Sequence, residues 1–475
     1  MKSNFVQKRA SFLYIICLLI LFYLKPALST PLNGALMSSI LIVYIFAIVV
    51  HFLSNDKSNW LRLDVFFLLG FTIVHLQWPI MYAFSNIIPE NYWRIFVDDQ
   101  LVNYTTWLSV LGGVFFLIGF NLLKTKKKPL SFIPVYNYKK LLYFTVISFV
   151  MFLALAGSSF LSGSVYKGEG GGTAGAGISK YLALLYQVGL TVLTAIIIYQ
   201  NKDKYKGNLF KWFLGLDKMY LSVLIVYVLL FLAIGDRSGP LAISLTILIL
   251  IANFVRKFKF YEVVIIAVVG GVLMTIIGLG RSESSGIDIL SSGADKYSNN
   301  TSYDTTLELA NSYRTLNTGV AHVPEKHDYF YGSLWVADLL SPLPFAQSLY
   351  LEITDKESYE IGTATYITYL VYGKNSPSGE GTSIIVDIYL NFGLVGVIFF
   401  MFILGLFLKK ISLENKSPSS IKWVFLISIL GGMSLYYSRS SYLFVLRDVI
   451  WGILFLKFFV KIKRRGYDEK NTTYL

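Results

Sequence analysis

Apolar runs of about 15 to 25 residues recur along the whole chain, and each approaches the length needed to cross a hydrocarbon core as an α-helix. Short polar segments separate these runs and hold most of the charged residues. The pattern predicts about twelve membrane-spanning helices, because a spanning segment must satisfy its own backbone hydrogen bonds. We place the helices at residues 10–24, 34–53, 63–84, 104–123, 141–160, 180–199, 218–234, 239–255, 262–280, 384–408, 422–437 and 442–460.

The same runs exclude a transmembrane β-barrel. Strands of a barrel alternate between lipid-facing apolar and interior polar residues, whereas residues 221–234 and 263–279 are apolar at nearly every position. The composition agrees with a helical membrane protein. Of the 475 residues, 55% are hydrophobic and only 15% are charged, against about 25% charged residues in a soluble domain. We therefore predict an all-α polytopic membrane protein.

The charged loops set the predicted orientation. When the loops are assigned to alternate sides, the side that holds the N-terminus receives more than two thirds of the 42 Lys and Arg residues. Both termini are therefore predicted to be cytoplasmic. A cleaved signal peptide is the alternative for the first run, which follows Lys8 and Arg9, but no convincing A-x-A cleavage site follows it. An uncleaved first helix also preserves the regular alternation of the loops.

One long segment of mixed polarity interrupts the pattern at residues 281–383, on the predicted extracytoplasmic side. It contains more than twice as many Asp and Glu residues as Lys and Arg residues. The chain thus divides into residues 1–280 with nine helices, this outer segment, and residues 384–475 with three helices and a cytoplasmic tail. Within the outer segment, residues 334–351 form an apolar stretch broken by prolines, which predicts an amphipathic or re-entrant element at the membrane surface.

The net charge of +14 does not indicate nucleic-acid binding, because the positive residues lie in short loops between spans. The single Cys17 lies in an apolar run and excludes a disulfide framework within one chain. The sequence has no Walker-type phosphate loop, and the pair Asp98 and Asp99 is the nearest approach to a metal-binding carboxylate motif. His322 and His327 do not match a zinc-binding spacing. No cofactor and no metal are expected.

Two further features allow more than one interpretation. Residues 168–177 are rich in glycine without the strand and helix of a phosphate loop, which favours a flexible linker over a backbone site for pyrophosphate. His75 and Gln77 lie in the middle of the third predicted span, ahead of Pro79. An interhelical hydrogen bond beside a proline kink explains this pair, and a proton relay of a transporter is the alternative.

Arginines recur at the predicted outer face. Arg237 lies in a tight turn at residues 235–240 (GDRSGP), and Arg439 lies in the turn between the last two spans. Arg281 ends the ninth span, and Arg447 lies about two turns into the last helix. The guanidinium group matches phosphate because its planar fork gives charged, bidentate hydrogen bonds. These four residues are candidate ligands of a lipid pyrophosphate. The alternative is that they reach lipid headgroups or pair with adjacent aspartates.

Two segments resemble a known family. Residues 379–396 (GEGTSIIVDIYLNFGLVG) resemble the segment that enters a late span in bacterial O-antigen and capsule polymerases of the Wzy type, and the GDRSGP turn is similar to a second motif of that family. The resemblance implies a GT-C-like membrane glycosyltransferase bundle in the bacterial inner membrane. It also implies polymerisation of undecaprenyl-pyrophosphate-linked repeat units on the extracytoplasmic face, without nucleotide or metal, with a flippase and a chain-length regulator as partners.

In the reaction that the resemblance implies, the lipid pyrophosphate of the growing chain is the leaving group. Arg237 and Arg439 are then candidate catalytic residues, because positive charge must lie where negative charge develops. The related ligases carry a histidine near the start of the corresponding span, but this chain has none there. Glu380 is our candidate general base. The alternative is a turn residue that caps the helix beginning near Ser383.

Three other functions fit part of the sequence. An O-antigen ligase would transfer the finished glycan to a different acceptor and is similar in motif. A flippase or transporter also has about twelve spans, but we find no internal two-fold repeat of the kind that many transporters show. A scaffold or sensor of the envelope would need none of the outer arginines. The repeat-unit polymerase is the hypothesis that uses the most features.

Overall fold

The structure is a computed structural model that describes residues 2–123, 135–156, 178–281, 286, 288–298, 304–376, 378–414 and 420–463. The glycine-rich segment at residues 168–177 lies outside these ranges. Helices make up most of the described chain, and its one sheet has two short strands. The prediction of an all-α architecture is therefore confirmed.

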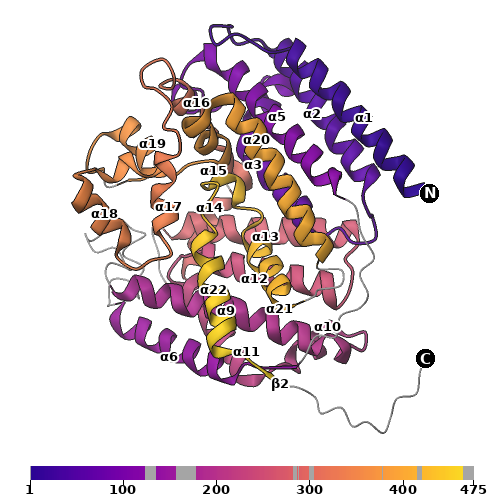
Figure 1. Cartoon of the computed structure of the whole chain (residues 1–475), viewed down its shortest axis with the longest axis vertical. Helices are drawn as coiled ribbons and strands as arrows, with labels where there is room; N and C mark the ends of the chain where they lie inside the picture. The colour runs from indigo at the N-terminus through magenta and orange to yellow at the C-terminus, as the bar shows by residue number, and fades with distance from the viewer. Residues whose placement is uncertain are drawn as a thin grey trace.

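One group of helices comes mainly from the N-terminal part of the chain. Its long helix α20 packs along α5 at two points where glycine brings the backbones together, because Gly119 faces the carbonyl of Phe402 and Gly405 faces the carbonyl of Phe116. Helices α1 and α2 pack against α5 beside it (Figure 1). The members are α1 (Lys2–Tyr23), α2 (Gly34–Ser54), α3 (Leu63–Ser85), α4 (Tyr92–Ile95), α5 (Asp99–Leu122) and α20 (Ile384–Glu414).

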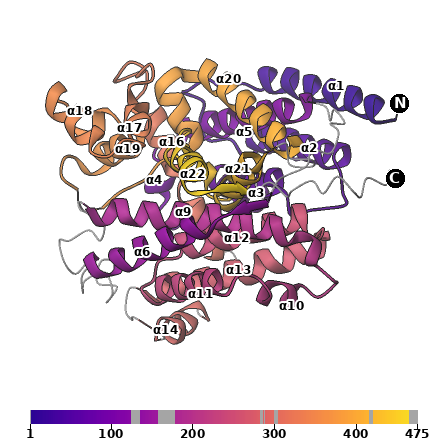
Figure 2. The same ribbon diagram turned by 60° about the horizontal axis from the view of Figure 1, so that its bottom comes forward.

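A second group of helices lies beside the first. Figure 2 shows the two groups as layers, with α3 of the first group and α21 and α22 of the second at the boundary between them. The short strands β1 (Val135–Asn137) and β2 (Lys461–Lys463) pair antiparallel and join the start of α6 to the end of α22. The members are α6 (Lys139–Leu155), α9 (Ile178–Asn201), η1 (Lys202–Lys204), α10 (Leu209–Leu214), α11 (Lys218–Ala233), α12 (Ser238–Phe254), α13 (Phe260–Gly280), α21 (Ile421–Met433) and α22 (Leu446–Phe459).

A helix of the structure lies at each of the twelve positions predicted as spans. Among the residues that the structure describes, six helices are long and apolar enough to cross a membrane: α2, α3, α5, α9 with η1, α13 and α20. Shorter apolar helices occupy four more of the positions, namely Ala10–Tyr23, Lys218–Ala233, Ser238–Phe254 and Ile421–Met433. The chain is thus consistent with a multi-pass membrane protein, while the number of twelve spans and the GT-C-like arrangement stay predictions.

The outer segment folds into short helices, of which α17, α18 and α19 lie together at the end of the bundle away from the N-terminus (Figure 1), while α14 packs against α13. Pro342 and Pro344 fall between α17 and α18 and break the stretch at 334–351 into two short helices. Leu339 and Leu349 of this stretch are exposed. The elements are α14 (Asp288–Tyr297), α15 (Asp304–Ala310), α16 (Tyr313–Val320), η2 (Ser333–Trp335), α17 (Val336–Leu340), α18 (Ala346–Thr354), η3 (Ser358–Glu360) and α19 (Thr363–Tyr372).

Asp387 of the 379–396 segment fastens this outer segment to α20. Its buried carboxylate accepts hydrogen bonds from the Trp335 indole N–H (2.7 Å), from the Thr363 hydroxyl and from the backbone N–H of Tyr442 (2.9 Å). One turn later, Asn391 accepts hydrogen bonds from the N–H groups of the chain entering η2. Asp387 and Asn391 therefore have a structural role within this segment, because they hold η2 and the start of α19 in place.

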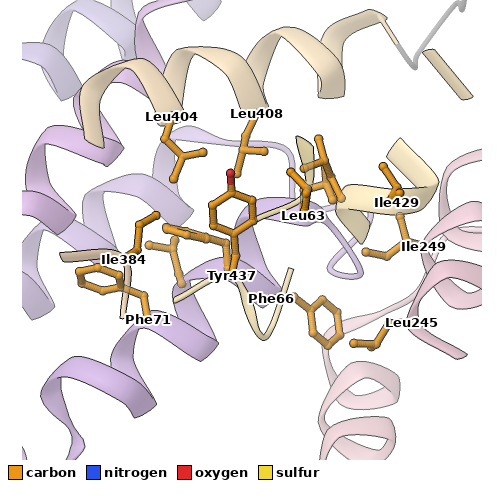
Figure 3. Packing of buried hydrophobic residues seen from close by; sticks show 14 of the residues in the cluster. Leu63, Phe66, Phe71, Leu245, Ile249, Ile384, Leu404, Leu408, Ile429 and Tyr437 are labelled. Carbon is orange, nitrogen blue, oxygen red and sulfur yellow. The ribbon is translucent and has the colours of Figure 1, made fainter. Parts of the chain in front are cut away.

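The turn η4 (Tyr437–Arg439) follows α21 of the second group and packs against α3 and α20 of the first group. Tyr437 is buried among apolar side chains of several helices (Figure 3). Its hydroxyl donates to the carbonyl of Tyr442 at 2.9 Å. Gly70 of α3 has no side chain to keep the Leu435 carbonyl away, so the chain approaches α3 closely just before the turn. This packing fixes the position of Arg439, the last residue of η4.

Candidate functional site

Arg237 begins the candidate site, at the turn between α11 and α12. The turn closes through Gly235, whose φ of +86° is the left-handed conformation that glycine adopts readily. The Arg237 guanidinium donates to the Met274 carbonyl of α13 at 2.9 Å and to both oxygens of Glu308 at 2.8 and 2.6 Å. The guanidinium is thus held on one side by a helix backbone and on the other by a carboxylate of α15.

Two further arginines, Arg281 and Arg439, lie near Glu308. Arg281, at the end of α13, has its Nη2 atom 3.9 Å from a Glu308 oxygen. Arg439 acts on the same carboxylate through its charge. Burial raises the pKa of Glu308, but the positive charges of these arginines outweigh it and hold the pKa below its ordinary value. The Glu308 side chain remains 53% exposed, so a ligand can reach this carboxylate from solvent.

Arg439 is the member of this group with the fewest partners. It is partly buried, and burial lowers the pKa of its guanidinium, which stays charged at neutral pH because the intrinsic value is so high. Within the described part of the chain, its guanidinium donates no hydrogen bond to another side chain. Its N–H groups are therefore available to an anion.

A second carboxylate, Glu380, lies in another group of cations. It is buried and accepts hydrogen bonds from Arg94 (3.0 Å), from Arg314 and from the Tyr372 hydroxyl (2.6 Å). Burial raises the pKa of Glu380, but these three donors together lower it below its ordinary value. A carboxylate held by three donors is a weak base as long as all of them stay in place.

The two groups are neighbours, because the charge of Arg314 acts on Arg439. Together they form what we call the arginine belt, in which five arginines surround the two carboxylates Glu308 and Glu380. The belt has an excess of positive charge at one end of the helix bundle. Its arginines are Arg94, Arg314, Arg439, Arg237 and Arg281.

The structure thus brings together three of the four arginines that the sequence singled out, and Glu380 lies in the neighbouring group. Arg447 lies elsewhere, on α22. Its Nε atom is 3.1 Å from the carboxylate of Asp448, and its charge acts on Asp338 of α17. The role of Arg447 as a pyrophosphate ligand, like the roles of the other four residues, stays a prediction.

Sequence reasoning missed Arg94, Arg314 and Glu308. Arg94 precedes α5 and pairs with Glu380, which is 286 residues away in the sequence. Arg314 and Glu308 lie in the outer segment, where charged residues of both signs are common. A charged side chain in such a segment gives no local signal of its partner, so only the fold identifies the pairing.

Other polar residues that stand out in the sequence cap a helix or pack against aromatic side chains. Asp98 caps the N-terminus of α5 by accepting from the N–H of Gln100. His75 is fully buried and packs on Phe71 with ring centroids 4.7 Å apart, beside the η4 turn. His327 stacks on Phe330 with centroids 4.3 Å apart. Within the described ranges, no group of histidine, cysteine, aspartate and glutamate side chains has the geometry of a metal site.

Comparison with known proteins gives one match. The family model of the O-antigen polysaccharide polymerase Wzy matches residues 10–467. No curated protein and no solved structure matches the chain. The matched range covers nearly the whole sequence, including both layers of helices and the arginine belt. The chain belongs to the O-antigen polysaccharide polymerase Wzy family, whose members are inner-membrane proteins that polymerise O-antigen repeat units.

Proposed function

We propose that this protein joins undecaprenyl-pyrophosphate-linked oligosaccharide units into O-antigen or capsular polysaccharide on the extracytoplasmic face of the inner membrane, without a metal ion. The observation that carries the proposal is the arginine belt, in which five guanidinium groups surround two carboxylates. With both termini in the cytoplasm, alternation of the spans puts the belt on the outer side. A lipid-linked unit presents its diphosphate at that depth.

The excess positive charge of the arginine belt can stabilise a departing diphosphate. As the bond between the sugar and the lipid diphosphate breaks, negative charge accumulates on the departing oxygen. Arg439 donates no hydrogen bond to another side chain in the described ranges, and Arg237 and Arg281 both lie against the exposed carboxylate of Glu308. A diphosphate that displaces Glu308 gains these donors, since guanidinium groups bind phosphate with charged, bidentate hydrogen bonds.

Glu380 fits the role of a base that substrate binding releases. If a diphosphate takes the hydrogen bonds of Arg314 and Arg94, the Glu380 carboxylate loses two of its donors and becomes more basic. It then accepts the proton of the acceptor hydroxyl. The acceptor oxygen forms a bond to the anomeric carbon, and the bond from that carbon to the diphosphate oxygen breaks, its electron pair leaving with the diphosphate.

The direct test uses purified full-length protein and lipid-linked repeat units, with and without a chelator. We expect a ladder of longer glycans in both conditions. Arg237→Ala and Arg314→Ala should shorten or abolish the ladder. Absence of a ladder under every metal condition, with intact substrate recovered, would contradict the proposal.

The same assay separates the alternatives. Transfer of the glycan to a different lipid acceptor without elongation would identify a ligase. Movement of the lipid-linked unit across a vesicle membrane without a new glycosidic bond would identify a flippase. A flippase forms no glycosidic bond and needs no base, so Glu380→Gln helps to separate a flippase from the two transferases. A ligase also removes a proton from its acceptor hydroxyl, so only the identity of the acceptor separates it from a polymerase.

A further inference from the structure

A cavity of about 350 Å³ lies in the second layer, between α9, α11, α12 and α21. On α12 it is lined from Ser238, the first residue of the helix, to Thr246, eight residues further on. At 1.5 Å per residue it therefore extends about 12 Å along the helix. Since a hydrocarbon core is roughly 30 Å thick, the cavity runs from the outer interface almost to the middle of the membrane.

The deep part of this cavity is mostly apolar, because the hydroxyl groups of its threonines are hydrogen-bonded to the backbone. The Thr191 hydroxyl donates to the carbonyl of Gln187 at 3.0 Å, and the Thr246 hydroxyl donates to the carbonyl of Ser428 at 3.0 Å. Both hydroxyls are thus satisfied by backbone. The side-chain amide of Gln187 also lines the cavity, and it donates to the Tyr186 hydroxyl at 3.5 Å. The remaining deep lining includes Val188, Leu190, Ile243 and Ile429.

The mouth of the cavity adjoins the arginine belt. Ser238 and Ser440 line the mouth, and they directly follow Arg237 and Arg439 in the chain. Tyr436 lines it as well, and the charges of Arg237, Glu308, Arg439 and Asp236 act on its hydroxyl. Asp448 also lines the cavity. One end of the cavity therefore lies beside the arginines of the belt, and the other end is mostly apolar.

We propose that this cavity holds the first isoprene units of a prenyl chain whose diphosphate binds the arginine belt; this inference rests on the proposed function. A cavity of about 150 Å³ is large enough to hold benzene, so one more than twice that volume has room for at least two branched five-carbon units. A single chain attached directly to a diphosphate matches one apolar cavity beneath several guanidinium groups. A bilayer phospholipid, by contrast, carries two chains and one phosphate.

Two substitutions fill the cavity from different walls. Ala242 lines it from α12, and Ala242→Leu adds three carbons at mid-depth. Val188 lines it from α9, and Val188→Phe places a ring there. Ala267→Leu is the matched control, because it makes the same change on α13, which does not line the cavity. Two variants that fill the cavity are used, so that the inference can still be tested if one of them misfolds.

The measurement is the affinity of the purified full-length protein for farnesyl diphosphate and for inorganic pyrophosphate. We expect Ala242→Leu and Val188→Phe to weaken farnesyl diphosphate binding by about tenfold or more, the equivalent of about two buried CH₂ groups. Their affinity for pyrophosphate, which has no tail, should be unchanged. Ala267→Leu should match the wild type for both probes.

Unchanged farnesyl diphosphate affinity in both folded filling variants would overturn the inference. So would competition by phosphatidylglycerol that is as strong as competition by farnesyl diphosphate, because a bilayer lipid would then be the occupant. Failure of the proposed function is a separate result, namely tail-dependent binding in the wild type without any glycan ladder. A ladder together with unchanged tail binding in the filling variants would sink only the inference about the cavity.

Discussion

Gly278 of α13 leaves the space in which the guanidinium of Arg237 lies, because a Cβ atom at this glycine would clash with the Arg237 Nη1 atom. We predict that Gly278→Ala displaces Arg237 from the Met274 carbonyl and from Glu308. Loss of one charged donor at a developing anion costs about 10²- to 10³-fold in rate. The measurement is the rate of glycan elongation by purified protein, with folding checked by thermal stability.

Gly271 provides the control for this experiment. It lies on the same helix, and a Cβ there would meet no atom within 4 Å. Gly271→Ala should keep full elongation activity. An equal loss of elongation activity in both variants would mean that any alanine in α13 disturbs the protein, and that the effect does not depend on the position of Arg237.

Arg439 and Arg447 should differ in their effect on pyrophosphate binding. Arg439 belongs to the belt and donates no hydrogen bond to another side chain in the described ranges, whereas Arg447 is paired with Asp448 on α22. We predict that Arg439→Ala weakens binding of inorganic pyrophosphate by roughly tenfold to a hundredfold, as loss of a charged hydrogen bond implies. Arg447→Ala should weaken it less. Equal effects would show that Arg447 moves into the site when the ligand binds.

Glu380 should affect the pH dependence of stability as well as activity. Its folded pKa lies below the ordinary value of 4.5, so its ion pairs stabilise the fold fully above that value. That stabilisation is lost as the pH falls through the lowered folded value. We predict that Glu380→Gln destabilises the protein by about 1 to 3 kcal/mol at pH 7. The difference from the wild type should shrink below pH 4.5, as measured by thermal unfolding in detergent.

A kinetic measurement then separates two roles for Glu380. If the carboxylate is the general base, Glu380→Gln abolishes elongation even at saturating substrate, whatever its effect on pyrophosphate affinity. If it only positions Arg94 and Arg314, the same variant changes pyrophosphate affinity and keeps measurable elongation at saturating substrate. Glu357→Gln, in an exposed pair with Lys374, is the control and should behave as the wild type in both assays.

Asp387 should act on the outer segment rather than on chemistry. Removing its carboxylate leaves the buried donors of Trp335 and Thr363 without their acceptor, which costs about 1 to 3 kcal/mol for each unsatisfied group. We therefore predict that Asp387→Ala lowers the melting temperature and speeds proteolysis within residues 304–376. Asp355→Asn, at an exposed position on the same segment, is the matched control. Unchanged proteolysis in Asp387→Ala would contradict the anchoring role.

The positions of the helices followed from the sequence because the length of an apolar run is a local property. Each predicted span coincides with a helix, and the outer segment begins and ends close to where the polarity changes. Arg237 and Arg439 were also identifiable, because a charge in a short turn between two apolar helices stands out. The split of the 334–351 stretch followed from its prolines, which cannot continue a helix.

Which charges meet could not be read from the sequence. Glu308 and Glu380 occur in a segment rich in acidic residues, and nothing local distinguishes them from their neighbours. The position of Arg439 near them depends on the close approach of the chain to α3 at Gly70, and the outer segment is anchored to α20 at Asp387. The sequence by itself therefore determined the helices and the supply of cations, because both are local. Only the tertiary structure decided where those cations converge, since ion pairs between residues hundreds of positions apart form only after the helices pack.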